Sequence, residues 1–353
     1  MSTSALIALG GYSTRGTGRG PGVELLRLTP RPGAAPDLER LATVDLPDPS
    51  FVLWSSDGSV LYAVLEGEPT RVVAVRVTSD GVRAEVVADL ALEGAGGCHL
   101  ALASPSTLVV AQYGSGSVVT VRLDADGLPV EQIDLDDHHD RADGQDPHPH
   151  QVVPLPGTSQ LAVPDLGLDR VFLYRQDAAG QMGLTGEIPL SRGSGPRHLV
   201  PDHESEQIHI ACELSGMVAT AVRSEQPAGR SAPAVMQSPA HRWSVRSMIP
   251  ASAREGADAL SHIELSADES LLLVANRGPD TLSLLSLAGM RPELVAEHEV
   301  GAHPRHFTQL EDLVLVAAQE GDRIDVLRRQ GEQLSVAAEP IPAPSVACLA
   351  VRP

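Results

Sequence analysis

The sequence predicts an all-β protein, a seven-bladed β-propeller closed by N- and C-terminal strands in one blade. Three observations predict this fold. The 32 glycines and 28 prolines are spread along the chain, and long apolar stretches with the helical period are missing. A strand–turn–strand–turn–strand unit recurs, and the two chain ends hold complementary parts of one more unit. We therefore expect one domain over residues 1–353.

Six segments share the repeated unit. They begin at Pro49, Cys98, Pro149, Pro196, Ser261 and Pro304. Aligned on Phe51, His99, His150, His198, Ile263 and His306, they recur at intervals of 48, 51, 48, 65 and 43 residues. The long fourth interval indicates an insertion at roughly residues 223–258. Intervals of about 40 to 50 residues are typical of propeller blades.

A seventh unit is divided between the two ends of the chain. PSVACLAV, from Pro344, fits its first strand, whereas ALIALGGY, from Ala5, and GVELLRL, from Gly22, fit its second and third. Pairing the two ends would close the ring and remove the two free sheet edges that promote aggregation.

Charge and composition exclude several classes of function. The chain has 46 acidic and 26 basic residues, all of the latter arginine, which gives a formal charge of −20. This charge disfavours nucleic acid or an anionic membrane as a partner, and the absence of lysine excludes Schiff-base and P-loop lysine chemistry. Cys98, Cys212 and Cys348 show neither zinc-ligand nor disulfide-framework spacing, so we expect buried thiols. No apolar run reaches the roughly 18 residues of a membrane span, and we expect a cytoplasmic protein.

The predicted topology gathers polar side chains at one mouth of the propeller. The first strand of each blade starts there, and the antiparallel second strand ends there. The starting residues are His148, His150, Arg197, His198, His262, Arg305 and His306. The ending residues are Tyr12, Glu66, Tyr113, Asp165, Glu213, Arg277 and Gln319. Inward guanidinium groups suit a phosphate or carboxylate, so we predict a small anionic ligand.

The chain resembles a known family from about Leu6 to Cys348. The motifs that carry the resemblance are, in chain order, GGYSTRGTGRG, CHLALA, AQYGSGSV, PHPHQV, VPDLGLDRVFLY, GSGPRHL, CELSG, VANRGPD and HPRHF. The family is that of the lactonases with a seven-bladed propeller, which includes bacterial 6-phosphogluconolactonases of the propeller type and fungal carboxymuconate-lactonising enzymes.

The resemblance implies a set of site residues. The catalytic candidates are His150, Glu213, Arg197 and Arg277. We expect substrate contacts from His148, Arg305, His198, Asp165 and Tyr113, although Asp165 also fits a hydrogen-bonded turn. One departure concerns the fifth blade, which has Ser261, His262 and Ile263 where the family commonly reads Ala-Glu-Ile, and whose carboxylate, Glu264, comes two residues later. That shift moves the side chain about 6 to 7 Å deeper along the strand.

The resemblance implies a lactone hydrolase that acts on an anionic sugar-acid lactone, with 6-phosphogluconolactone of the pentose phosphate pathway as the leading substrate. His150 or Glu213 would deprotonate the attacking water, while Arg197 and Arg277 would hold the phosphate or stabilise the oxyanion. The alternatives are a muconate-type cycloisomerase and a noncatalytic propeller that binds a metabolite or protein. We expect no cofactor and no metal, because the acidic run at residues 136–140 is explained by solvated charge. The loop at residues 135–147 is a candidate flap over the mouth.

Overall fold

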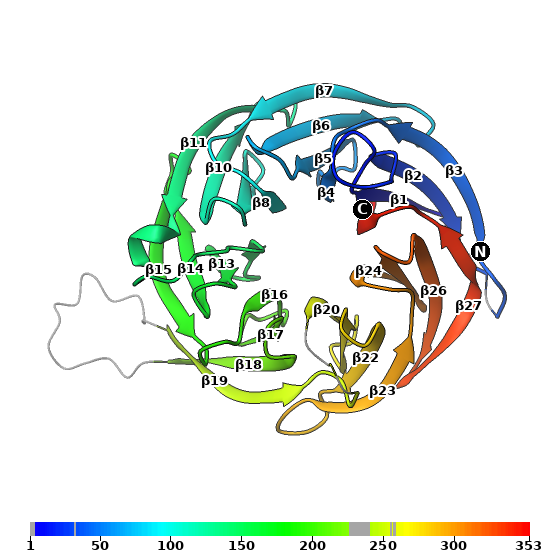
Figure 1. Cartoon of the computed structure of the whole chain (residues 1–353). Coiled ribbons are helices and arrows are strands. Elements are labelled where there is room, and N and C mark those ends of the chain that lie inside the picture. The colour runs from blue at the N-terminus through cyan, green and yellow to red at the C-terminus, as the bar shows by residue number, and fades with distance from the viewer. Residues whose placement is uncertain (1–3, 32, 226–240, 255, 257–258) are drawn as a thin grey trace, which may run out of the picture.

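The computed structural model describes residues 4–31, 33–225, 241–254, 256 and 259–353. Within these residues, seven four-stranded antiparallel sheets stand in a ring around a central axis (Figure 1). The predicted seven-bladed propeller is confirmed. The described residues contain no helix long and apolar enough to cross a membrane.

Each blade has an innermost strand, which starts at the mouth that carries the predicted site. These strands are β4 (Pro49–Trp54), β8 (Gly97–Ser104), β12 (Val153–Pro154), β16 (Pro196–Pro201), β20 (Leu260–Leu265), β24 (Pro304–Leu310) and β28 (Val346–Val351). The second strands are β5 (Val60–Leu65), β9 (Thr107–Gln112), β13 (Gln160–Asp165), β17 (Gln207–Cys212), β21 (Leu271–Asn276), β25 (Leu313–Ala318) and β1 (Ala5–Gly11).

The two outer positions of each blade complete the sheets. The third strands are β6 (Arg71–Val77), β10 (Ser117–Leu123), β14 (Arg170–Gln176), β18 (Met217–Glu225), β22 (Thr281–Ser286), β26 (Arg323–Gln330) and β2 (Val23–Thr29). The outermost are β7 (Ala84–Ala91), β11 (Pro129–Asp137), β15 (Met182–Pro189), β19 (His241–Pro250), β23 (Glu293–Glu299), β27 (Gln333–Pro342) and β3 (Asp37–Val44). A short 3-10 helix, η1 (His138–Arg141), follows β11.

Sequence pattern follows position in the blade. Strands β9, β21 and β25 are buried along their whole length, because neighbouring sheets cover both of their faces. They accordingly read as continuous apolar runs. The outermost strands alternate partly buried and exposed residues, as in β7 and β23, because one of their faces meets water.

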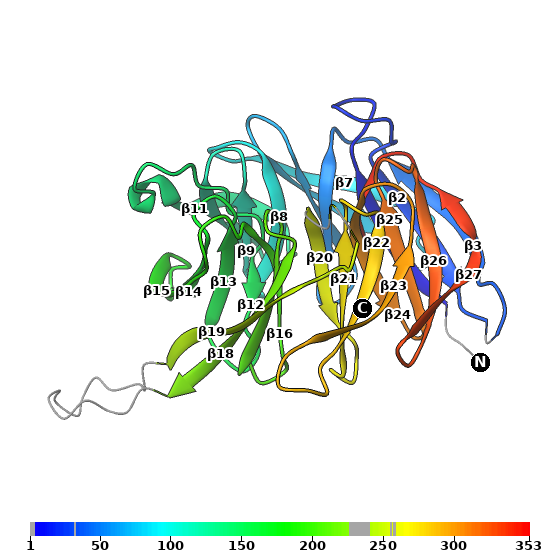
Figure 2. The same ribbon diagram turned by 60° about the horizontal axis from the view of Figure 1, so that its bottom comes forward.

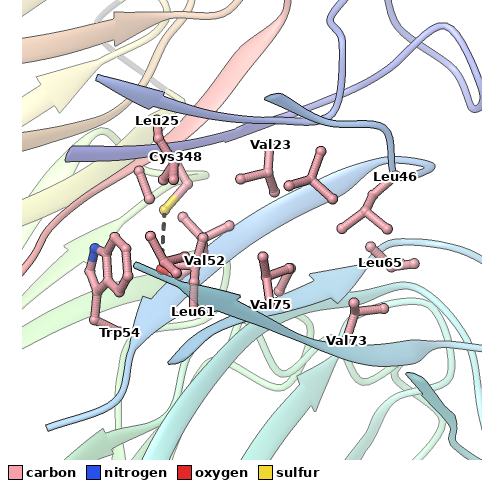
Figure 3. Close-up of a cluster of buried hydrophobic side chains, with 14 residues drawn as sticks. Val23, Leu25, Leu46, Val52, Trp54, Leu61, Leu65, Val73, Val75 and Cys348 are labelled. Atoms are coloured by element: carbon pink, nitrogen blue, oxygen red, sulfur yellow. Dashed lines mark hydrogen bonds between the residues drawn. The ribbon is translucent and has the colours of Figure 1, made fainter. Parts of the chain in front are cut away.

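The chain ends close the ring as predicted. Strand β28 pairs antiparallel with β1, with Ile7 opposite Val351 and Leu9 opposite Leu349. The apolar side chains of this blade pack against those of the next blade, β4-β5-β6-β7 (Figure 3). Cys348 lies fully buried in that interface, and burial raises its thiol pKa to about 12. Cys98 and Cys212 are also buried free thiols.

The long interval between the fourth and fifth units contains an extended hairpin. Strands β18 and β19 pair from Met217 opposite Pro250 to Glu225 opposite His241. Trp243 on β19 is buried against the core of this blade. Residues 226–240 of the predicted insertion lie outside the described residues.

A β-bulge interrupts the start of most innermost strands. The pairing with the second strand shifts between Pro196 and His198 and between Pro304 and His306, and a similar shift occurs in β4, β8 and β20. A bulge adds one residue to a strand and re-aims its side chain. Arg197 and Arg305 occupy these extra positions, so that each arginine and the histidine after it both reach the interior of the ring.

Candidate active site

Two arginines share one carboxylate at the predicted mouth. Arg197 Nε lies 2.9 Å from Glu213 Oε2, and Arg277 Nη2 lies 2.5 Å from the same oxygen. Backbone carbonyls hold both guanidinium groups, since Arg197 Nη1 donates to the carbonyl oxygen of Ser261 at 2.7 Å and Arg277 Nε to that of Ala259 at 3.1 Å. These contacts bring together three residues from two neighbouring blades. Arg197 lies at the bulge in β16, Glu213 follows β17, and Arg277 follows β21.

A second cluster lies at the same mouth. Tyr12 Oη donates a hydrogen bond to Glu66 Oε2 at 2.7 Å, and Arg305 Nη2 lies 3.9 Å from that oxygen. The Arg305 guanidinium also stands 5.3 Å from the centre of the Tyr12 ring, within cation–π range. Sequence reasoning placed Tyr12 and Glu66 at the mouth but assigned them no chemical role.

The two clusters are electrostatically linked. Burial is the largest cause that lowers the pKa of Arg197 to about 9, and the positive charges of Arg277 and Arg305 act in the same direction against the opposing effect of Glu213. Burial likewise lowers the pKa of Arg277. For Arg305, burial acts to lower the pKa, but Tyr12 and Glu66 outweigh it and raise the pKa. Three buried or largely buried guanidinium groups therefore face two carboxylates, which leaves one positive charge that an anionic ligand would balance.

His148 and Tyr113 form one wall of the site. The two rings stack with centroids 4.2 Å apart and planes 11° apart. His148 Nδ1 lies 2.9 Å from the carbonyl oxygen of Tyr113. The Tyr113 ring also meets the edge of the His150 ring at 5.6 Å, so the two histidines of the Pro-His-Pro-His segment flank one tyrosine.

Aromatic rings fill the axis of the propeller below the arginines, and we call this set the imidazole floor. Its members are Phe51, His99, His150, His198, His262 and His306. Neighbouring rings lie 3.9 to 5.7 Å apart. Burial, the largest cause, lowers the pKa of each of the five histidines well below its usual value, to about 3 for His262. The floor is therefore uncharged at neutral pH.

His198 belongs to this floor. Its Nδ1 lies 2.8 Å from Nδ1 of His262, and such a contact needs one nitrogen to donate and the other to accept. Only 3% of the surface of His198 is exposed. Arg197, which reaches the mouth, is the residue before it in strand β16. The structure therefore places His198 in the support of the site, and its expected substrate contact stays a prediction.

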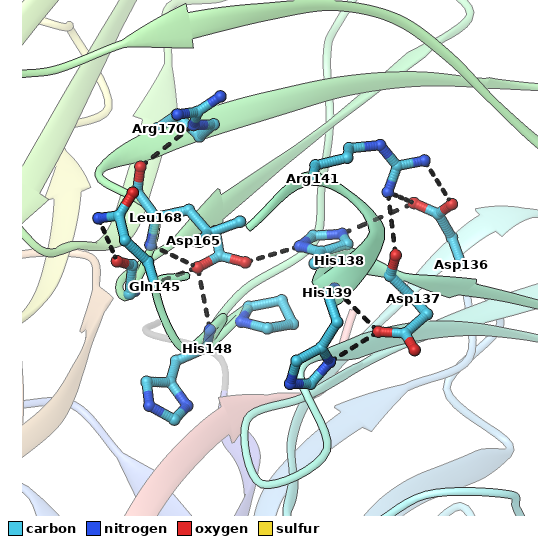
Figure 4. A network of polar contacts seen from close by, with 12 residues as sticks. Asp136, Asp137, His138, His139, Arg141, Gln145, His148, Asp165, Leu168 and Arg170 are labelled. Atoms are coloured by element: carbon cyan, nitrogen blue, oxygen red, sulfur yellow. Dashed lines mark hydrogen bonds and ion pairs between the residues drawn. The ribbon is translucent and has the colours of Figure 1, made fainter. Parts of the chain in front are cut away.

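Asp165 does not reach the mouth either. Asp165 is the last residue of strand β13, as Gln112 is of β9 and Asn276 is of β21. Tyr113 and Arg277 each come one residue after their strand, so their equivalent in this blade is Leu166. The repeat alignment is displaced by one residue at this strand, and a one-residue shift turns a strand side chain to the opposite face. Asp165 is fully buried, and its carboxylate contacts His138 at 2.6 Å and the backbone of His148 (Figure 4).

The fifth blade carries a similar displacement. His262, and not Ile263, occupies the floor position that His198 and His306 occupy in neighbouring blades. Glu264 comes two residues deeper, where it accepts a hydrogen bond from Gln309 Nε2 at 2.9 Å and contacts His262 Nε2 at 3.2 Å. Burial raises the Glu264 pKa to about 7. This carboxylate therefore lies beyond the imidazole floor, away from the arginines.

The acidic segment before Pro147 is structured by its own contacts. Asp137 caps η1 by accepting from the backbone nitrogen of His139, and Asp136 binds Arg141 at 2.7 Å. Among the described residues, no group of three or more histidine, cysteine, aspartate or glutamate side chains is arranged to hold a metal ion. The Gly-rich loop at residues 12–20 rises above the same end of the ring (Figure 2). Thr17, Gly18 and Arg19 of this loop line a hollow together with Gln319.

Comparisons with known proteins agree with this architecture. A family model described as "Lactonase, 7-bladed beta-propeller" matches residues 7–351. The solved structure of a periplasmic gluconolactonase from Pseudomonas aeruginosa has a TM-score of 0.86 and 24% identity, over 99% of both chains. A Bacteroides uniformis protein, described provisionally as a 6-phosphogluconolactonase, has a TM-score of 0.85 and 20% identity over 99% of both chains. An uncharacterised protein of Lactococcus lactis subsp. cremoris is 25% identical over 97% of this chain and 98% of its own length.

Proposed function

Because the chain belongs to the family of lactonases with a seven-bladed β-propeller, we propose that it hydrolyses the lactone of an anionic sugar acid. The first substrate to test is 6-phosphogluconolactone, because one of the similar structures is described provisionally as a 6-phosphogluconolactonase. A cytoplasmic location and a place in the pentose phosphate pathway stay predictions.

The arginine excess at the mouth carries this proposal. Arg197, Arg277 and Arg305 have two carboxylates, Glu213 and Glu66, between them. Removing guanidinium groups from water without full charge compensation is costly, and an anion placed among them recovers part of that cost. Guanidinium groups also bind phosphate and carboxylate oxygens in pairs, which would orient a ring substrate.

The same groups suit the chemistry of lactone opening. Water adds to the ring carbonyl, and the negative charge that develops on the carbonyl oxygen is stabilised by a guanidinium N–H donor. A general base takes one proton from that water, and His150 and Glu213 are the candidates that the sequence offered. His150 is neutral because burial lowers its pKa well below the usual value, so its imidazole has a free lone pair at neutral pH.

The test is the rate of acid release from 6-phosphogluconolactone above its spontaneous opening, followed by pH-stat. We expect Arg197→Gln, which removes a guanidinium donor, to lower turnover about a hundredfold or more. We expect an effect of similar size for Glu213→Gln, which removes the charge that holds both arginines in place. Arg71→Gln is the matched control, because Arg71 pairs with Asp89 on the outer part of a blade. Near-wild-type turnover by both site variants would remove them from the mechanism.

Substrate classes are compared in the same assay. Simple uncharged lactones should react more slowly than the phosphorylated one, since they leave the arginine excess unbalanced. A muconate that is cyclised while no lactone is hydrolysed would favour the cycloisomerase alternative. Tight binding of 6-phosphogluconate without turnover of any of these compounds would favour a noncatalytic propeller.

A further inference from the structure

We infer that His148 is the group that takes the proton from the attacking water, and that Asp165 is the positioning residue that holds His148 in place. The inference rests on the proposed function. It names as general base a histidine that the sequence predicted only as a substrate-binding residue.

The hydrogen bond to Tyr113 defines the tautomer of His148. A backbone carbonyl oxygen can only accept, so the Nδ1 atom 2.9 Å from the Tyr113 oxygen must carry the proton. Nε2 is then the nitrogen with the free lone pair. A neutral imidazole in one fixed tautomer is the form that a general base requires.

The ring of His148 is also held and accessible. Its stacking on Tyr113, at 4.2 Å and 11°, fixes its plane, while 24% of its side chain remains exposed. Asp146 Oδ2, on an exposed side chain, lies 3.7 Å from Nε2 and would stabilise the imidazolium once the proton has been taken.

The other two candidates are less suited to this role. His150 is 6% exposed, and its Nδ1 lies 3.8 Å from the sulfur of Cys98, a contact that does not define the tautomer of the ring. Glu213 Oε2 is already engaged by two guanidinium groups. Their geometry fits substrate binding and charge balance better than proton transfer.

Asp165 clamps the backbone on which His148 stands (Figure 4). Its Oδ1 accepts from the backbone nitrogens of His148 at 2.9 Å, Gly167 at 3.1 Å and Leu168 at 2.9 Å. The carbonyl oxygen of His148 in turn accepts from the backbone nitrogen of Leu166 at 3.0 Å. Both backbone polar groups of His148 are therefore tied to the end of strand β13.

A buried chain of contacts fixes the orientation of Asp165. Its Oδ2 contacts His138 Nδ1 at 2.6 Å, and His138 Nε2 lies 2.9 Å from Tyr174 Oη. Tyr174 Oη donates to Asp136, which binds Arg141. Asp165 and His138 are completely buried, so the carboxylate cannot turn towards the mouth. Asp165 therefore acts through His148 and not on substrate.

The proposed step is balanced. Nε2 of His148 takes one proton as the water oxygen bonds to the carbonyl carbon, and the imidazolium returns that proton to the ring oxygen as the carbon–oxygen bond breaks. The carboxylic acid so formed releases one proton to solvent. No other reactant is needed.

The first experiment compares His148→Gln with His203→Gln, the same change at an exposed histidine on another loop. We expect His148→Gln to lower kcat about a hundredfold or more, with KM changed less than about threefold, since general bases contribute factors of about 10² to 10⁴. Added imidazole should restore part of the rate to His148→Ala but not to Arg197→Gln. A His148→Gln enzyme with wild-type kcat, or His148→Ala without rescue, would overturn the inference.

The second experiment separates positioning from folding. Asp165→Asn alone should lower kcat about tenfold or more, because a neutral amide oxygen accepts from the three backbone N–H groups more weakly than the carboxylate does. In the His148→Ala background with imidazole, Asp165→Asn should have little further effect, because a diffusible base needs no clamp. An equal loss in both backgrounds would show a structural role only and would refute the positioning role.

These outcomes are distinct from failure of the proposed function. A wild-type protein that opens none of the lactones would sink the function itself. A wild-type protein that is active, is disabled by Arg197→Gln and is unaffected by His148→Gln would sink only the assignment of His148.

Discussion

Each histidine of the imidazole floor makes folding depend on pH. In the unfolded chain a histidine takes up a proton near pH 6.5, whereas in the fold burial keeps the pKa of these five rings well below that value. Below about pH 6.5 the unfolded state therefore binds more protons than the folded state. Stability from the floor is fully present above that pH and is lost as the pH falls.

Glu264 acts in the opposite direction over a narrower range. Burial raises its pKa from 4.5 to about 7, so the folded state keeps a proton that the unfolded state has released. Its contribution is greatest at low pH and is lost as the pH rises from about 4.5 to about 7. Five histidines against one carboxylate leave a net loss of stability on acidification.

Phe51 offers a direct test, because it occupies the floor position of the first blade without a titrating group. Replacing His306 by Phe removes one proton that the unfolded state binds and the folded state does not. The unfolding free energy should then depend less steeply on pH, by about 1.4 kcal/mol per pH unit between roughly pH 6 and 5. Urea unfolding at several pH values measures this slope. The reverse change, Phe51→His, should steepen it by a similar amount, and identical slopes in all three proteins would contradict an uncharged imidazole floor.

At the level of the strand, repeat spacing identified the blades but not the registers within them. The order of apolar and polar segments predicted all seven blades and the residues Arg197, Glu213 and Arg277 that the structure brings into contact. Asp165 and Ile263 were each placed one residue away from the equivalent position. A β-bulge, or a proline-rich strand end, adds or removes one residue locally, and a repeat alignment averages over such shifts. The signal that could have corrected the fifth blade was the recurrence of histidine, which His262 continues and Ile263 does not.

The Gly-rich loop shows a second limit of sequence patterns. The motif predicts a turn, but a partner distant in the chain holds it in place. Asp48 accepts from the backbone nitrogens of Ser13 at 2.8 Å and Thr17 at 2.8 Å, and from the Thr17 hydroxyl at 2.9 Å. Gly16 permits this approach, since a Cβ there would come within 2.2 Å of the Asp48 carboxylate.

Removing that carboxylate should free the loop. In Asp48→Ala we expect amide hydrogen exchange in residues 12–20 to accelerate about tenfold or more, because hydrogen bonds to a charged acceptor contribute about 1.5 to 3 kcal/mol each. Exchange measured by mass spectrometry reports it peptide by peptide. Asp57→Ala is the control, because it removes a carboxylate that organises a different turn through Ser55 and Ser59. Unchanged exchange in residues 12–20 of Asp48→Ala would show that the loop is held by other contacts.

For the whole molecule, ring closure joins residues more than three hundred positions apart. Strand β28 supplies the inner strand of the blade that β1 begins, and Trp54 of the next blade donates its indole N–H to the carbonyl oxygen of Ala350 at 3.0 Å. The terminal strand thus contacts both sheets that flank the closure. One contact of the site spans this closure directly, since Tyr12 follows β1 and Arg305, whose guanidinium lies over the Tyr12 ring, is on β24 of the neighbouring blade.

Deleting residues 346–353 should therefore abolish the folded monomer. The deletion removes the buried side chains of Val346, Cys348 and Leu349 and leaves β1 as a free edge. Burial of such side chains contributes about 1.5 to 3 kcal/mol each, and the sum approaches the net stability of about 5 to 15 kcal/mol that folded proteins have. We expect aggregation in size-exclusion chromatography and loss of the cooperative urea transition. Deletion of the exposed Pro353 alone keeps β28 and should change neither property. A protein without β28 that stays monomeric and unfolds cooperatively would contradict this expectation. It would show that packing between blades holds the ring closed without the pairing of β1 and β28.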